Sequence, residues 1–309
     1  MKIFRNLEDF VLPDKPLVAV LGNFDGVHLG HQKLIKTAKD ITDSLRGETL
    51  VFTFFPHPQL VLNKEIQMLN SFELKTRLIK DLGVDSILAI PFTEEISKLT
   101  PQQFVQQVLH EKLKVSHVVA GFNFSFGYQG SGKALDLIRL AGELNIKVTI
   151  MEPFYMDKEL VSSTRIREYI KKGQIKKASK LLGYQPTIQG KVVSGNRIGR
   201  QIGFPTANLE WDRHLLIPGP GVYAVKVAVN DDLKLGVLNI GFKPTVSEKE
   251  ILTMEVNILE FNQEIYDWKI EINFYEKIRN EKKFNNITQL KEQIALDIIS
   301  CRKIFASLD

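Results

Sequence analysis

The sequence has a single cysteine, Cys301, among its 309 residues. One cysteine cannot form a disulfide within the chain, which favours a reducing compartment. No apolar run approaches the roughly 20 residues that cross a bilayer, and residues 1–6 lack the apolar segment of a signal peptide. We therefore expect a cytoplasmic protein with no membrane partner, in which Cys301 packs inside a predicted helix.

The chain also lacks a concentrated charge. Its 41 Lys and Arg residues exceed its 36 Asp and Glu residues by 5, and they are dispersed rather than gathered in a basic tail. No basic stripe with interleaved aromatic residues is present, so we expect no nucleic-acid partner. Phosphate-bearing small molecules fit this charge as well. A length of 309 residues favours two domains.

Strand and helix patterns alternate in the first part of the chain. Apolar and β-branched runs predict strands at residues 17–21, 49–55, 86–90, 115–120 and 146–151. Helical periodicity and caps predict helices at residues 34–45, 72–82, 101–113 and 172–182. This alternation indicates an α/β fold with a parallel sheet, and such sheets bind ligands at the carboxyl ends of their strands.

The pattern changes after residues 184–187, which we interpret as a short linker, with the domain boundary between residues 184 and 185. Period-two alternation predicts strands at residues 192–193, 221–229, 233–240, 251–261 and 268–274. A compact antiparallel barrel is the fold that such strands favour. An apolar stripe over residues 290–308 predicts a final helix that covers an open end of the barrel.

Two histidines, His28 and His31, lie where a predicted buried strand turns into an amphipathic helix. The N-terminal end of a helix carries unpaired N–H groups and partial positive charge, which suit a phosphate. Gly30 places no side chain between the two imidazoles, so a phosphate chain could approach the backbone. Taken alone, these histidines fit a pair of surface residues at a helix start equally well.

Residues 127–133 have the Gly-x-x-x-x-Gly-Lys spacing of a phosphate-binding P-loop. The next residue is Ala134, so the hydroxyl that would hold Mg²⁺ is missing. No buried strand leads directly into Gly127 either. We therefore do not expect a P-loop here.

Three further features have a structural explanation beside a chemical one. Ser162, Ser163 and Thr164 stand at a predicted helix start, where such residues usually act as caps. The glycine-rich residues 195–208 fit ordinary turns as well as a phosphate-facing loop. Glu255 alternates with apolar neighbours and points away from their face, as a solvated strand residue would.

The first part of the chain resembles a known family. Residues 22–28, with His-x-Gly-His at residues 28–31, resemble the adenylyltransferase half of bacterial bifunctional riboflavin kinase/FAD synthetases, within the nucleotidyltransferase superfamily. Residues 162–167 resemble its Ser-Ser-Thr-x-x-Arg signature, and residues 124–127 its Phe-x-Phe-Gly loop. The resemblance implies nucleotide and phosphate contacts at Gly22, Asn23, Phe24, Asp25, His28, Gly30, His31, Ser162, Ser163, Thr164 and Arg167.

The same resemblance implies flavin contacts in the loops that follow two of the predicted strands. These are His57, Pro58, Asn123 and Phe126. Asn123 stands where many members carry Asp, so the oxygen is kept and a charge is lost.

Residues 199–208 resemble the riboflavin kinase signature Gly-Arg-x-x-Gly-Phe-Pro-Thr-Ala-Asn without a gap. The resemblance implies a flap over the phosphates at residues 199–204, and Mg²⁺ held at Thr206 and Asn208. The flap's implied phosphate contacts are Gly199, Arg200 and Gly203.

Three more positions match this second signature set. Glu255 matches the glutamate that takes a proton from the ribityl hydroxyl of riboflavin. Residues 239–245 resemble Asn-Ile-Gly-x-x-Pro-Thr, and residues 279–284 resemble Arg-x-Glu-x-x-Phe, which implies a flavin contact at Arg279.

Together the resemblances imply a Rossmann-like FMN adenylyltransferase domain over residues 1–184, followed by a small β-barrel riboflavin kinase domain with a C-terminal helix over residues 185–309. The implied substrates are ATP, riboflavin and FMN, with Mg²⁺ as cofactor. The implied catalytic residues are Glu255, His28, His31 and Arg167. Two alternatives remain, a chain active in one domain only and a flavin-sensing regulator without turnover. The oligomeric state is not predicted.

Overall fold

The computed structural model describes residues 1–62, 65–195, 199, 202–230, 232–244 and 250–308. The chain forms two compact units, the first made of Met1–Ile66 with Phe72–Ser162 and the second of Gln67–Ser71 with Ser163–Asp309. Residues 163–184 therefore group with the second unit, whereas the sequence analysis places them in the first domain. The boundary between the functional domains stays a prediction.

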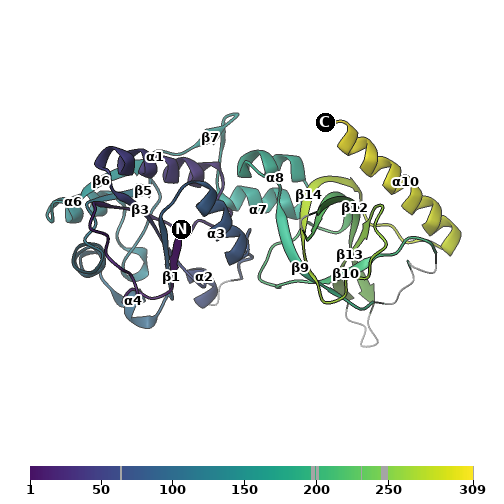
Figure 1. Cartoon of the computed structure of the whole chain (residues 1–309), viewed down its shortest axis with the longest axis horizontal. Helices are drawn as coiled ribbons and strands as arrows, with labels where there is room; N and C mark the ends of the chain where they lie inside the picture. Colours follow the sequence, from purple (N-terminus) through teal and green to yellow (C-terminus); the bar gives the residue numbers. More distant parts are fainter. Residues whose placement is uncertain (63–64, 196–198, 200–201, 231, 245–249, 309) are drawn as a thin grey trace. The chain divides into compact units, whose positions relative to one another are not determined.

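A six-stranded sheet organises the first unit, in the order β1-β4-β3-β2-β5-β6, and every neighbouring pair in it is parallel (Figure 1). All five predicted strands are present, and β1 is an additional short edge strand that the periodicity did not reveal. The strands are β1 Lys2–Phe4, β2 Leu17–Leu21, β3 Glu48–Phe54, β4 Ser86–Ile90, β5 His117–Gly121 and β6 Lys147–Met151.

Helices cover both faces of this sheet, as a parallel sheet requires. The main ones are α1 Leu29–Leu45, α3 Phe72–Asp81, the π-helix η1 Phe104–Lys112 and α6 Ala134–Gly142. The central strand β2 shows the two faces directly. Leu17, Ala19 and Leu21 pack in one core cluster with η1 and α6, while Val18 and Val20 pack in another with α1 and α3.

Short elements complete the first unit. They are α2 Pro58–Val61, α4 Glu94–Lys98, α5 Pro101–Gln103, the 3-10 turn η2 Tyr128–Gly130, and the two-stranded hairpin of β7 Tyr155–Met156 with β8 Glu159–Leu160.

The predicted helix at residues 101–113 is present but changes type along its length. Its capping box is confirmed, because the Gln103 N–H donates to the Thr100 hydroxyl and the Thr100 N–H donates to the Gln103 amide oxygen. After one turn it continues as η1, in which the Leu113 N–H reaches back to the Val108 carbonyl. Periodicity alone does not distinguish this wider winding from an α-helix.

A closed six-stranded antiparallel barrel forms the second unit, in the order β10-β13-β12-β11-β14-β9. The predicted barrel is confirmed. Strand β10 was missed in the sequence, because it is short and begins at the last two residues of the signature at residues 199–208. The strands are β9 Thr187–Val193, β10 Ala207–Glu210, β11 Gly221–Val229, β12 Asp232–Pro244, β13 Glu250–Ile258 and β14 Lys269–Arg279.

Among the described residues of the second unit, the barrel is accompanied by the helices α7 Ser163–Lys171, α8 Ile175–Leu182 and α10 Ile287–Ala306. Of these, α8 packs against β14, and the Lys176 ammonium lies 2.6 Å from the Glu276 carboxylate. This packing is why residues beyond Ser162 group with the barrel rather than with the parallel sheet.

The final helix α10 packs against β12, β11 and β14. Figure 1 shows this helix, in yellow, beside the barrel. Cys301 and Phe305 of this helix share a core cluster with Val222 and Ala224, which alternate with the residues inside the barrel. The expectation that α10 covers an open end is therefore wrong. Cys301 is fully buried there, as predicted, and burial raises the pKa of its thiol to about 11.

We expect Phe305→Ala to loosen α10 from the barrel wall. The Phe305 ring is buried and meets the Tyr275 ring edge-on at 4.8 Å, so its removal leaves a cavity. The expected loss is about 3–5 kcal/mol of unfolding free energy, measured by urea denaturation. Leu308→Ala is the matched control, because Leu308 is exposed and its truncation should leave the denaturation midpoint unchanged. Equal midpoints for the two variants would contradict this account of α10.

Candidate active sites

The turn between β2 and α1 (residues 22–28) lies where the strand order of the parallel sheet reverses. From β2 the chain adds β3 and β4 on one side, and then β5 and β6 on the other. Open α/β sheets bind ligands outside the carboxyl ends of their strands at such a reversal. The loop after β5 begins at the same edge, so the sheet brings two of the predicted ligand loops together.

His28 and His31 form one stacked pair at the start of α1. His28 is the N-cap residue, and its ring Nδ1 accepts a hydrogen bond of 3.3 Å from the His31 N–H. The two ring centroids are 3.6 Å apart, with 15° between the planes. A Cβ built on Gly30 would lie 3.2 Å from the His28 ring, so a side chain at Gly30 would displace that ring. Ring stacking and the hydrogen bond therefore fix the two histidines relative to each other, and they are not two independent surface residues.

Burial sets the charge of His31. Desolvation, followed by the charges of His28 and Lys75, lowers the pKa of His31 well below its ordinary value. The His31 imidazole is therefore neutral near pH 7. Its ring Nδ1 is buried and has no hydrogen-bond partner among the residues that the structure describes. His31 can therefore offer a hydrogen bond to a phosphate, but not a full positive charge of its own.

Lys75 is a charged residue at this turn that the sequence analysis missed. It projects from α3, is buried, and its Nζ donates a hydrogen bond of 2.9 Å to the Asn23 carbonyl. Burial lowers the pKa of the Lys75 amine to about 8, and the nearby Asp25 carboxylate opposes that shift. A lysine in a helix is normally assigned to the solvated face, so the sequence carries no signal that separates Lys75 from its neighbours.

Four of the residues with implied flavin contacts follow strands β3 and β5 of the first unit. His57 is buried and caps α2, because its Nδ1 accepts from the Gln59 N–H, and Pro58 is the first residue of that helix. Asn123 is exposed on the loop after β5. Phe126 is buried in the core cluster and stacks on the Phe124 ring. His57 and Pro58 therefore lie at the start of a helix and Asn123 on an exposed loop, whereas Phe126 lies inside the core.

The glycine-rich stretch at residues 127–133 is not a P-loop, in agreement with the sequence analysis. Its middle is the short 3-10 turn η2, and the Lys133 ammonium donates to the Gly130 carbonyl of the same stretch. The lysine is therefore tied to its own loop.

The signature at residues 162–167 spans the division between the two units. Ser162 ends the first unit, whereas Ser163 and Thr164 begin α7 in the second. Arg167, one turn further along α7, donates from Nε to the Gln67 carbonyl at 2.8 Å. That Ser162, Ser163, Thr164 and Arg167 bind the same nucleotide as the histidine pair stays a prediction.

In the barrel, strand register brings the predicted kinase residues into one row. Asn208 of β10 lies directly opposite Glu255 of β13, which in turn lies opposite Asn239 of β12. Asn239 is opposite Val222 of β11, and Val222 is opposite Arg279 of β14. Directly opposed residues on one face have Cβ atoms about 4.5–5.5 Å apart, so the row is continuous. Glu255 faces outward, as predicted, because its neighbours Met254 and Val256 are buried inside the barrel.

Two cavities of the second unit meet at Thr206. The first, of about 300 Å³, lies between the barrel wall and α10 and contains Glu255, Asn208, Arg279 and Asp297 among its lining residues. The second, of about 270 Å³, is lined mainly by residues 256–266 and by the loop at residues 205–207. Thr206 lines both cavities.

Of the predicted flap residues, Gly199 lines the first cavity, and its carbonyl accepts from the Phe204 N–H at 2.8 Å. Gly203 adopts a φ of +87°, a conformation that favours glycine, and it is exposed. Arg200 lies outside the described residues.

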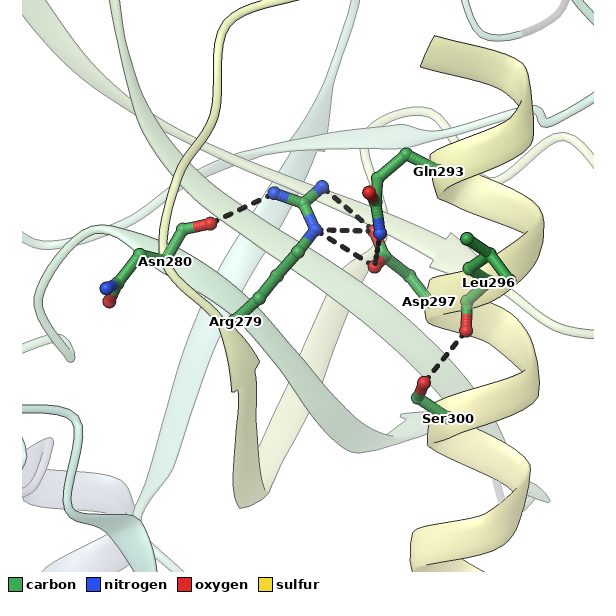
Figure 2. Close-up of polar contacts among 6 residues, drawn as sticks. All are labelled: Arg279, Asn280, Gln293, Leu296, Asp297 and Ser300. Atoms are coloured by element: carbon green, nitrogen blue, oxygen red, sulfur yellow. Dashed lines mark hydrogen bonds and ion pairs between the residues drawn. The ribbon is translucent and has the colours of Figure 1, made fainter. Parts of the chain in front are cut away.

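Arg279 is held by a residue that the sequence analysis missed. Figure 2 shows its guanidinium paired with the Asp297 carboxylate of α10, with Nε–Oδ1 and Nη2–Oδ2 distances of 2.9 Å. The Gln293 amide donates to the same carboxylate, and Arg279 Nη1 donates to the Asn280 carbonyl. Asp297 sits on the apolar stripe of α10, where a carboxylate is unexpected, and that position was the available signal.

Asn257 is the second missed residue of this site. It faces the same side of β13 as Glu255, and its Nδ2 donates a hydrogen bond of 2.6 Å to the Pro205 carbonyl. This bond ties the loop that carries Thr206 to the strand that carries Glu255.

Comparisons with known proteins agree with both halves of the chain. Residues 12–165 match the family model described as FAD synthetase, and residues 182–305 match the one described as riboflavin kinase. Bifunctional riboflavin kinase/FMN adenylyltransferases from Listeria monocytogenes and Bacillus subtilis are 43% and 41% identical to the chain, each covering 94% of it and 93% of the relative. The Escherichia coli relative of the same name is 33% identical over 99% of this chain and 98% of its own.

A solved structure described as a macrolide-efflux protein from Streptococcus pneumoniae shares the fold over the whole chain. Its TM-score is 0.88 at 32% identity, covering 97% of this chain and 98% of that one. The description as a macrolide-efflux protein belongs to the Streptococcus pneumoniae protein and is not transferred to this chain. In this chain, no helix within the described residues is long and apolar enough to cross a membrane.

These matches define an enzyme that joins an FAD synthetase domain to a riboflavin kinase domain. The chain belongs to the family of bifunctional riboflavin kinase/FMN adenylyltransferases. With ATP it phosphorylates riboflavin to FMN through the C-terminal domain, and it adenylylates FMN to FAD through the N-terminal domain.

We expect Asp297→Ala to impair riboflavin phosphorylation by releasing Arg279 from its place in the first cavity. The loss of a charge-assisted pair predicts roughly a tenfold or larger fall in kcat/KM for riboflavin. Steady-state kinetics with ATP and varied riboflavin measures this fall.

The matched control is Arg302→Ala, which removes an exposed ion pair of the same helix, that with Glu260 at 2.8 Å. It should phosphorylate riboflavin like the wild type. If Asp297→Ala and Arg302→Ala give the same kcat/KM, the Arg279–Asp297 pair is not part of the site.

Proposed function

We propose that riboflavin phosphorylation takes place in the row of residues on the outer face of the barrel, with Glu255 as the general base. The register that sets Asn208, Glu255 and Asn239 side by side is the observation that carries this proposal. Glu255 would accept the proton of the riboflavin hydroxyl while that oxygen attacks the γ-phosphorus of ATP. The bond from this phosphorus to the ADP oxygen breaks as the new one forms.

Riboflavin would occupy the cavity that contains Glu255, with Arg279 among its contacts, and ATP the neighbouring cavity. Phosphoryl transfer requires the riboflavin hydroxyl and the γ-phosphate of ATP to come into contact. The two cavities share the lining residue Thr206, so substrates bound in them would lie next to each other. Gly199, Arg200 and Gly203 would form the flap at the phosphates. The bond from Asn257 to Pro205 would keep the Thr206 loop in register with Glu255.

The residues around Thr206 fit Mg²⁺. The Thr206 hydroxyl and the Asn208 amide supply the oxygen ligands that this ion prefers, and Glu255 lies directly opposite Asn208. Within the described residues, no group of three or more His, Cys, Asp or Glu side chains could hold a metal ion by itself. Phosphate oxygens and water would therefore complete the shell, and the ion would offset the charge on the phosphates.

Adenylyl transfer, in our proposal, takes place at the turn between β2 and α1. An FMN phosphate oxygen would attack the α-phosphorus of ATP, and pyrophosphate would leave. This nucleophile is ionised at neutral pH, so no general base is required. The neutral His31, with His28 and the N–H groups at the start of α1, would donate hydrogen bonds to phosphate oxygens.

The remaining predicted contacts complete this first site. Gly22, Asn23, Phe24, Asp25 and Gly30 would shape the turn that receives ATP. Ser162, Ser163, Thr164 and Arg167 would hold the departing phosphates, because hydroxyl and guanidinium groups match their charge. The flavin of FMN would lie at His57, Pro58, Asn123 and Phe126.

We further propose that the functional domains are residues 1–184 and 185–309, and that the protein acts in the cytoplasm without nucleic-acid partners. The family models, which end at residue 165 and begin at residue 182, are compatible with that boundary.

We expect Glu255→Gln to lower kcat for riboflavin phosphorylation by about 10²–10⁴-fold, because glutamine cannot accept the proton. The assay follows FMN formed from riboflavin and ATP. Glu292→Gln, an exposed change on α10, is the control and should behave like the wild type. A Glu255→Gln enzyme with wild-type kcat would show that Glu255 is not the base.

We expect His31→Ala to lower FAD formation from supplied FMN by about 10²–10³-fold, because a hydrogen-bond donor to the phosphates is lost. Riboflavin phosphorylation by the same protein should be unchanged, which controls for folding of the chain. His110→Ala, at an exposed position of η1, should leave both reactions intact. If His31→Ala forms FAD as fast as the wild type, adenylyl transfer does not take place at this turn.

A further inference from the structure

Lys75 is a buried titratable residue that the reactions described above do not use. It lies on α3 between Leu74 and Thr76, all three buried, and only 6% of Lys75 is exposed. Burying an ammonium group is costly unless partners compensate for the lost water. The burial of Lys75 therefore indicates that specific contacts stabilise its ammonium group.

The hydrogen bonds of Lys75 lead to the start of the turn between β2 and α1. Its Nζ donates to the Asn23 carbonyl at 2.9 Å, and the Thr53 hydroxyl of β3 donates to the same oxygen at 3.3 Å. One carbonyl thus accepts bonds from two other elements of the unit. Because Asn23 directly precedes the tightly wound part of the turn, where Phe24 and Val27 have positive φ angles, these bonds fix where the turn leaves the sheet.

The charge of Lys75 acts on the same turn. The amine interacts with the Asp25 carboxylate, which is also buried, and its positive charge is one of the influences that lower the pKa of His31. His31 in turn stacks on His28. Three elements, α3, the turn and the start of α1, therefore contribute titratable groups to one buried cluster.

We propose that Lys75 is a positioning residue for adenylyl transfer, whose ammonium group holds the Asn23 carbonyl and provides the buried positive charge beside His31. The proposal rests on the assignment of adenylyl transfer to this turn. Since His31 itself is neutral, the ammonium group of Lys75 supplies a positive charge to this cluster that His31 does not. Loss of that charge would weaken both the turn and the attraction of ATP.

The pH dependence of the reaction gives this role a measurable signature. Burial lowers the pKa of the Lys75 amine to about 8, while Asp25 opposes the shift. Thr53, the contact from β3, carries no charge. The titratable groups whose charges interact with Lys75 are the Asp25 carboxylate of the turn and the His31 imidazole of α1. The amine is charged below its pKa and neutral above it. Activity that needs the ammonium therefore falls as the pH rises through about 8.

The experiment measures kcat/KM for ATP in FAD formation from FMN, because this ratio reports the groups of the free enzyme. The full-length wild type, Lys75→Arg and Lys75→Met are compared between about pH 6 and about pH 10. Lys80→Met is the matched control, since Lys80 is an exposed lysine of the same helix. Riboflavin phosphorylation and thermal unfolding of each variant are measured alongside.

We expect the wild type and Lys80→Met to lose activity above a midpoint of about 8. Lys75→Arg should keep its activity over that range, because arginine stays charged. Lys75→Met should be about 10²-fold less active at neutral pH, the scale of a misplaced reacting group, with riboflavin phosphorylation unchanged.

A Lys75→Met enzyme with wild-type kcat/KM, or a Lys75→Arg enzyme that loses activity over the same pH range as the wild type, would overturn the proposal. If Lys75→Met loses thermal stability, the comparison of the wild type with Lys75→Arg decides. The assignment of the turn is tested separately. If His31→Ala forms FAD normally, adenylyl transfer does not occur at this turn, whereas normal FAD formation by Lys75→Met with an impaired His31→Ala removes only the role of Lys75.

Discussion

Strand register is the constraint on which both sites of this protein depend. In the barrel, backbone hydrogen bonds between β10, β13 and β12 place Asn208, Glu255 and Asn239 side by side. A slip of one residue in any of these strands would turn its polar side chain into the barrel interior. In the parallel sheet, the pairing of β2 with both β3 and β5 sets the position from which the histidine turn departs.

Buried charges act in opposite ways in the two units. In the second unit, Arg279 and Asp297 form a hydrogen-bonded ion pair that joins the barrel to α10 at the edge of a cavity. In the first unit, burial lowers the pKa of the Lys75 amine, and the Asp25 carboxylate opposes that shift only in part. The Arg279–Asp297 pair holds α10 against the barrel, whereas the Lys75 amine can change its charge at a pH of about 8.

Much of the fold followed from hydrophobic period and from turn residues. The strand at residues 17–21 is apolar throughout and the strand at residues 86–90 is apolar after Ser86, so a parallel sheet buried on both faces was the direct interpretation. The missing parts have local reasons. Strand β10 has only four residues and begins at the end of the signature at residues 199–208, and the π-helical winding of η1 leaves the same apolar spacing as an α-helix. The stripe of α10 predicted that the helix is covered, but not which surface of the barrel covers it.

Local pattern and motif spacing are properties of consecutive residues, and they were enough to predict both folds, the order of the domains, and His28, His31 and Glu255 as candidate site residues. The distant residues that contact these positions became apparent only from the packing of the elements. Lys75, Asn257 and Asp297 are linked to the candidate sites by hydrogen bonds to residues far away in the chain or on another element. Nothing in the local pattern of a helix or strand records such a partner, because burial and charge arise only when the elements pack.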